Sequence, residues 1–137
     1  MRNPYRKMVS AYARILEKGR DLPAGGMDAP RKPKIARKAP CVMIFSPHPD
    51  DECIIGGLAL RLLRELKMDV VNVAVTQGSN KDRQAERLEE LKKACEYLGF
   101  RLAITKEGGL EKISVKTRER EPAVWNTAVE NIRNILV

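Results

Sequence analysis

Histidine is almost absent from this chain, which has one among 137 residues, and aromatic residues make up only 4% of it. With one histidine and no Cys-x-x-Cys pair the sequence holds no zinc finger, and the few aromatics disfavour a nucleic-acid-binding protein. The three cysteines cannot all pair within one chain, so a reduced, cytoplasmic setting is expected.

Long apolar runs are lacking as well. No segment approaches the length of a membrane span, and residues 1–30 have no continuous apolar core of the kind that a secretory signal needs. The first strand-to-helix turn also lacks a Gly-x-Gly-x-x-Gly loop and carries anionic side chains instead, which disfavours nucleotide binding there.

The lone histidine lies next to three consecutive carboxylates in residues 46–52, which read SPHPDDE. The apolar residues 42–45 before them are typical of a buried parallel strand, and Pro47 and Pro49 prevent a helix from starting before Asp50. These polar side chains are therefore expected at the carboxyl end of a strand. That edge of an open α/β sheet is where ligands bind.

Spacing and chemistry predict a metal site in this segment. His48 and Asp51 are three residues apart and can reach one divalent ion from the same turn, and zinc accepts both nitrogen and oxygen ligands. Asp50 then projects elsewhere and stays free to take a proton from water activated by the metal. The suggested chemistry is metal-assisted hydrolysis.

A purely structural interpretation competes with this one. Asp50, Asp51 and Glu52 are also what a helix start favours, because acidic side chains in a first turn satisfy free N–H groups and oppose the helix dipole. Cys53 is close enough to be considered as a substitute ligand, although its place in the helix is expected to turn it toward the core.

In its wider context the segment resembles the PIG-L/LmbE-like family of zinc-dependent deacetylases, which remove acetyl groups from N-acetylglucosamine on small molecules or lipids. The resemblance covers roughly residues 40–137 and rests on four features: the His48-to-Glu52 motif, the pair Gly56-Gly57, Thr76-x-Gly78 after the second strand, and the helix pattern from Arg87 through Glu90, Leu91 and Ala94 to Leu98-Gly99.

The resemblance implies a role for five residues. His48 and Asp51 would bind Zn²⁺ or another divalent metal, Asp50 would be the general base, and Arg87 and Glu107 would bind an N-acetylglucosamine-bearing substrate. The chain departs from the family pattern in the loop after Thr76, which lacks a second glycine and an acidic residue. Glutamate also stands at 107, where relatives often have aspartate.

A further departure concerns the metal. Family members add a histidine from a later His-Pro-Asp-His-like segment, whereas this chain offers two of the three protein ligands that a catalytic zinc ordinarily has. The tail, residues 124–137, is an apolar helix pattern without a polar exit. The expectation is therefore the amino-terminal part of a longer domain, or a homo-oligomer whose neighbour covers that face. The alternative is a catalytically inactive, truncated relative that serves as a binding or oligomerisation module.

The order of elements predicts an α/β, Rossmann-like three-layer fold with a mostly parallel sheet. Strands are expected at 42–45, 70–75 and 100–104, and helices at about 51–66 and 82–98. Six residues of the first of these helices are expected to face the core: Ile54, Ile55, Leu58, Leu62, Leu63 and Leu66. A solvated loop is the default for the charged run at 116–121.

A basic arm precedes the predicted domain, with residues 1–39 as one unit and 40–137 as the other. Residues 1–40 hold eleven lysines and arginines against three acids, a net of +8, which is the net charge of the whole chain. An amphipathic helix near the start and a Pro-, Gly- and Lys-rich linker at 21–40 are expected. The helix is suited to an anionic membrane surface, but packing of its apolar face on the domain or on a neighbouring subunit is the favoured interpretation.

Overall fold

The structure, a computed structural model, describes residues 3, 5–22, 28 and 30–136. Its elements follow one another as α1 (Arg6–Gly19), β1 (Cys41–Ser46), α2 (Asp51–Arg64), β2 (Asp69–Ala74), the 3₁₀ turn η1 (Lys81–Arg83), α3 (Gln84–Leu98), β3 (Arg101–Ile104), α4 (Val115–Arg120) and α5 (Pro122–Leu136). This order confirms the predicted α/β class. Val137, the last residue of the predicted tail helix, lies outside the described part.

The three strands form one parallel sheet in the order β1-β2-β3. Cys41 pairs with Asp69 at the start of β1 and β2, and Val71 pairs with Arg101 at the start of β3. The Arg101 guanidinium donates to Asp69 at 2.6 and 3.0 Å, which ties β3 to β2 and raises the pKa of Arg101. Because all three strands run the same way, the loops that follow them meet at one edge of the sheet.

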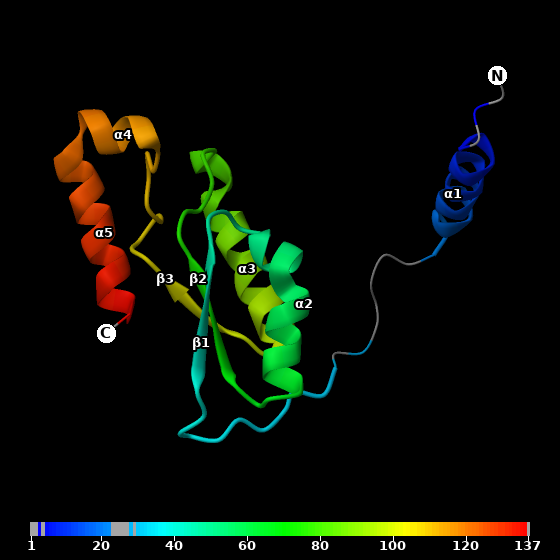
Figure 1. The fold of residues 1–137 in the computed structure, drawn as a ribbon, viewed down its shortest axis with the longest axis horizontal. Coiled ribbons are helices and arrows are strands. Elements are labelled where there is room, and N and C mark those ends of the chain that lie inside the picture. Colours follow the sequence, from blue (N-terminus) through cyan, green and yellow to red (C-terminus); the bar gives the residue numbers. More distant parts are fainter. Residues whose placement is uncertain (1–2, 4, 23–27, 29, 137) are drawn as a thin grey trace.

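Helices lie on both sides of the sheet. Figure 1 shows α2 and α3 together on one side and α5 on the other, as expected of a Rossmann-like arrangement. The core between the sheet and α2 and α3 is a single cluster of buried side chains: Ile44, Ala59, Leu63, Val70, Ala74, Leu91, Cys95 and Phe100. Gly99 ends α3 at a φ of 86°, a left-handed conformation that favours glycine.

The predicted apolar stripe of α2 is wrong in part. Leu63 is buried and Leu62 packs against the core, but Ile54 and Leu58 are 80% and 67% exposed and Leu66 is also exposed. The side chain of Ile55 lies outside the described part of the structure. Ala59, which the predicted stripe does not include, is buried in the core cluster. The sequence prediction counted only large apolar residues as core and therefore missed this alanine.

Two helices follow the third strand. The charged run predicted as a loop contains α4, which begins after Ser114, whose hydroxyl accepts the Thr117 N–H at 3.1 Å as an N-cap. The predicted apolar tail helix is confirmed as α5. Ala128 is its buried residue, while Val129 and Leu136 are exposed.

A buried polar group lies under the end of β1. Asn72 and Ser46 are fully buried, and the Ser46 hydroxyl donates to the Asn72 side-chain oxygen at 2.7 Å. The Asn72 amide in turn donates to Cys95 Sγ at 3.6 Å. Because Ser46 is the last residue of β1, these contacts fix the point from which the polar segment leaves the sheet.

The amino-terminal helix α1 lies apart from the sheet and its helices (Figure 1), and none of its residues is buried. The expectation that its apolar face packs on the domain is therefore wrong, whereas packing on a neighbouring copy stays a prediction. Among the described helices, none combines the length and the apolar character that crossing a bilayer requires.

Candidate functional site

The turn between β1 and α2 carries the polar segment at the carboxyl edge of the sheet, as predicted. It places Asp50 at φ 102° and ψ −18°, in the left-handed region, directly before the first residue of α2. Residues with a Cβ rarely adopt this conformation, and such strain gathers at functional sites. Lys67 and Lys112 also have positive φ, but Asp50 has the largest value of the three and is the one that lies in the polar segment.

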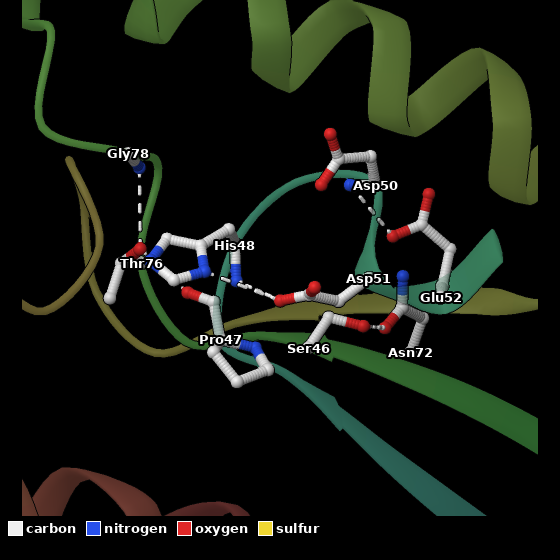
Figure 2. A network of polar contacts seen from close by, with 9 residues as sticks. All are labelled: Ser46, Pro47, His48, Asp50, Asp51, Glu52, Asn72, Thr76 and Gly78. Atoms are coloured by element: carbon white, nitrogen blue, oxygen red, sulfur yellow. Dashed lines mark hydrogen bonds and ion pairs between the residues drawn. The ribbon is translucent and has the colours of Figure 1, made fainter. Parts of the chain in front are cut away.

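His48 and Asp51 face one another across this turn (Figure 2). His48 Nδ1 lies 3.4 Å from Asp51 Oδ2, and the same oxygen accepts the His48 backbone N–H at 2.7 Å. The imidazole is 64% exposed, so it is open to a ligand. The structure thus brings together the two residues that the i, i+3 spacing pairs in sequence.

The distance between these two side chains suits a shared zinc ion. Two ligand atoms about 2.0–2.1 Å from a tetrahedral zinc are about 3.3–3.4 Å apart, and the Nδ1-to-Oδ2 distance is 3.4 Å. The pair therefore fits one edge of a tetrahedral site. Among the described residues, no group of three or more His, Cys, Asp and Glu side chains comes close enough to hold a metal.

Glu52 has a place that the sequence did not predict. Its side chain is 2% exposed, and Oε2 accepts the Asp50 backbone N–H at 3.1 Å. The structural interpretation is therefore confirmed in part: Asp51 and Glu52 lie in the first turn of α2, and Glu52 accepts the N–H of the N-cap residue, as the acid of a capping box does. Asp50 makes no side-chain cap hydrogen bond, while Asp51 and Glu52 accept N–H groups from the turn before the helix.

The Asp50 carboxylate is left free of these contacts. Figure 2 shows it on the opposite side of the turn from the Asp51 carboxylate, away from the His48 ring. The free carboxylate agrees with the expectation that Asp50 projects differently from the two paired residues. Its role as a base stays a prediction.

The loop after β2 is fastened to this turn by Thr76. The Thr76 hydroxyl donates to the Pro47 carbonyl oxygen at 2.6 Å and accepts the Gly78 N–H at 3.2 Å. Gln84, at the start of α3, donates to the Gly78 carbonyl at 2.8 Å. The Thr76-x-Gly78 segment noted in the sequence is thus the link that sets the position of the turn holding His48.

The loop after β3 reaches the same edge through a glycine. Gly109 pairs with Thr76 in an isolated antiparallel bridge, and the Leu110 N–H donates to the Val75 carbonyl at 2.8 Å. A Cβ on Gly109, whose φ is 72°, would lie 2.8 Å from the Gln77 nitrogen. Only glycine allows this approach, which carries Glu111 and Lys112 toward His48.

These loops enclose a polar cleft of about 400 Å³, here called the His48 cleft, within the usual range of small-molecule sites. Its lining includes three cationic side chains, Lys81, Arg87 and Lys112, and one acid, Glu111, which pairs with Lys81 at 3.4 Å. A neighbouring cleft of about 270 Å³, the Asp50 cleft, includes Asp50, Glu52 and Arg83.

Arg87 lines both clefts. Its guanidinium lies against Gly78, where an added Cβ would come within 2.8 Å of Nη1. The structure therefore places Arg87 beside the motif, as expected of a substrate-binding residue. Glu107 is exposed and does not line the His48 cleft, where Glu111 stands instead. The substrate roles of both residues stay predictions.

Cys53 is exposed, so the expectation that its side chain turns into the core is wrong. Its thiol donates to Glu52 Oε1 at 3.6 Å, and desolvation together with the negative charge of Glu52 raises the pKa of Cys53. A role for Cys53 as a substitute ligand stays a prediction.

Fold and site together define an α/β protein with a polar cleft at the carboxyl edge of a parallel sheet, the usual place for a small-molecule enzyme site in this class. The family model PIG-L, described as GlcNAc-PI de-N-acetylase, matches residues 43–136, so the chain belongs to the PIG-L family. Membership indicates a deacetylase of GlcNAc-type substrates. No curated protein and no solved structure matches the chain.

Proposed function

We propose that this chain contributes His48, Asp50 and Asp51 to a metal-dependent amide hydrolase that removes the acetyl group from an N-acetylglucosamine-bearing small molecule or glycolipid. The observation that carries the proposal is the 3.4 Å separation of His48 Nδ1 and Asp51 Oδ2 at the carboxyl edge of the sheet. Membership in the PIG-L family supports the acetamido substrate.

His48 and Asp51 would hold a divalent metal, Zn²⁺ by preference because one nitrogen and one oxygen ligand suit it. When bound there, the metal supplies a polarised acetyl carbonyl and a water of lowered pKa. The Asp50 carboxylate borders the neighbouring cleft in this structure, so it would have to turn toward His48 to accept a proton from the attacking water and return it to the leaving nitrogen. The carbon–nitrogen bond breaks, and acetate and a free amine are released.

The cleft supports the binding half of the proposal. Arg87 and the Thr76 loop border the space next to His48, and their polar groups suit the hydroxyls and the amide of a sugar. Thr76 acts on the turn itself, because its hydroxyl bonds the Pro47 carbonyl. Arg87 is the residue that we expect to touch substrate.

Metal binding tests the site on the 137-residue chain itself. Competition with a chromophoric zinc chelator should reveal weak binding, because two protein ligands hold less tightly than three. His48→Ala and Asp51→Ala should each abolish it, and Asp21→Asn, an exposed change outside the site, should leave it intact. Zinc binding that survives both site substitutions would show that the pair is not the metal site.

A free-amine assay on N-acetylglucosamine conjugates tests the reaction. The expected result is slow amine release that requires added zinc and is lost in Asp50→Asn but kept in Asp21→Asn. Release that Asp50→Asn leaves unchanged would exclude Asp50 as the base. No release above background would count against deacetylation by this chain, and robust release would refute the view that two ligands are too few.

A further inference from the structure

The helix α1 exposes a complete apolar face. Six large side chains on it are between 54% and 73% exposed: Tyr5, Met8, Val9, Tyr12, Ile15 and Leu16. Their spacing of three and four residues places them on one side of the helix. A face of this kind is normally buried, so its exposure here requires an explanation.

The opposite face of α1 is cationic. Arg6, Lys7, Arg14 and Lys18 lie there, and Glu17 is the one acid within the helix. Among the described residues, no salt bridge joins a cation of residues 1–40 to an acid anywhere in the chain. Within the described part of the chain, the cations of the arm are therefore not paired with acids.

We propose that α1 binds the surface of an anionic lipid bilayer. An interface of this kind takes both faces at once, because the apolar side chains enter the acyl boundary while the lysines and arginines meet lipid headgroups. Tyr5 and Tyr12 have the amphipathic rings that favour this depth. The helix has 14 residues, too few to span a bilayer, so it lies in the plane of the surface.

Other possible binding partners of α1 would contact either its apolar face or its cationic face, but not both. Nucleic acid would neutralise the cations and leave the apolar side chains in water. A second copy would cover the apolar face and leave two sets of cations unpaired. The apolar groove beside α5, about 310 Å³ and lined by Trp125 and Ile132 among others, includes Arg133 and offers no acid to a basic helix. Charge complementarity therefore favours the anionic bilayer.

Lipid binding by α1 does not depend on the hydrolase proposed above, since it involves no residue of either cleft. A helix of 14 residues is marginal in water and gains order when its apolar face is buried. We therefore expect the helical circular dichroism signal of the whole chain to increase when anionic vesicles are added. Vesicle cosedimentation measures the affinity directly.

The experiment uses the 137-residue chain with phosphatidylcholine vesicles, alone or containing about one third phosphatidylserine. Val9→Gln with Leu16→Gln removes apolar contacts without changing charge, and Ser10→Gln with Ala13→Gln introduces the same two glutamines off the apolar face. Arg14→Gln with Lys18→Gln removes two charges. Each lost cation should weaken binding roughly fivefold.

Support for the proposal is binding to anionic vesicles that is strong at low salt, weak to phosphatidylcholine alone, lost in the Val9 and Leu16 variant and kept in the Ser10 and Ala13 variant. Equal binding to both vesicle types would overturn it, as would equal loss in both glutamine variants. Failure to bind anionic vesicles would also overturn it. Dimerisation through α1 in sedimentation velocity, or duplex DNA binding unaffected by the Val9 and Leu16 changes, would then show what the helix binds instead. Urea midpoints should be the same in all variants, because α1 does not pack on the domain.

Discussion

Replacing Asp50 by glycine should leave the protein more stable than replacing it by alanine, although both changes remove the proposed base. Asp50 has φ 102° and ψ −18°, where a residue with a Cβ is strained. The left-handed conformation costs such a residue about 1–2 kcal/mol. Its side chain makes no cap hydrogen bond, so the fold loses little when the carboxylate is removed.

The matched comparison is Asp50→Gly against Asp50→Ala, because both lack the carboxylate and only alanine has a Cβ. Glycine relieves the strain but loses about 0.5–1 kcal/mol more backbone entropy on folding. The difference leaves glycine ahead by about 1 kcal/mol. At a urea dependence of about 1–3 kcal/mol per molar, the midpoint should be higher by about 0.5 M.

Urea unfolding followed by far-ultraviolet circular dichroism measures this difference. The control is the same pair of substitutions at Asp82, which lies in the 3₁₀ turn η1 and has no left-handed backbone. Alanine should be the more stable of the two there. If alanine is also equal to or better than glycine at Asp50, the turn is not strained and the backbone argument for its special role fails.

Two further predictions concern the buried polar group. Ser46→Ala and Asn72→Ala should each destabilise the chain, the first by about 1–3 kcal/mol because it leaves a buried amide oxygen without its donor. In a double-mutant cycle of these two substitutions, the cost of the cavity left by Asn72→Ala cancels. A coupling energy of about 1 kcal/mol between Ser46 and Asn72 should remain. Strict additivity would show that their 2.7 Å hydrogen bond contributes nothing to stability. Burial also raises the pKa of the Cys95 thiol, so the unfolded chain releases this proton at lower pH than the folded chain. The unfolding free energy should therefore fall as the pH rises above about 8.5, the ordinary pKa of a thiol. Cys95→Ala should make that fall less steep, and an unchanged slope would contradict the assignment.

The sheet and the helices around it could be predicted because their signals are local. Residues 42–45 and 70–75 are short apolar runs between turn signals, and the observed β1 and β2 differ from them by a single residue at each end. The i, i+3 spacing of His48 and Asp51 likewise indicates a pair, which the structure places 3.4 Å apart. Periodicity and spacing were sufficient for these features.

Other features depend on contacts that no local pattern contains. The charged run of α4 favours a loop, and only Ser114 signals the helix as an N-cap. Glu52 is buried and accepts the N–H of Asp50, a left-handed residue that nothing in the sequence marks. In the sequence, Gly109 is only the second residue of a Gly-Gly pair. Glycine is required there because the backbone of the loop after β2, distant in sequence, leaves no room for a Cβ.

The strand that delivers the polar segment also lies at the border of the sheet. Among the described residues, β1 pairs with β2 alone, so the backbone N–H and C=O groups along its other side have no strand partner. Its six residues, CVMIFS, include no lysine and no proline, which are the residues that commonly protect such borders from intermolecular pairing. β1 is therefore a ready template for strand addition, and any strand that joins it, from this chain or another, would run directly alongside the turn that holds His48.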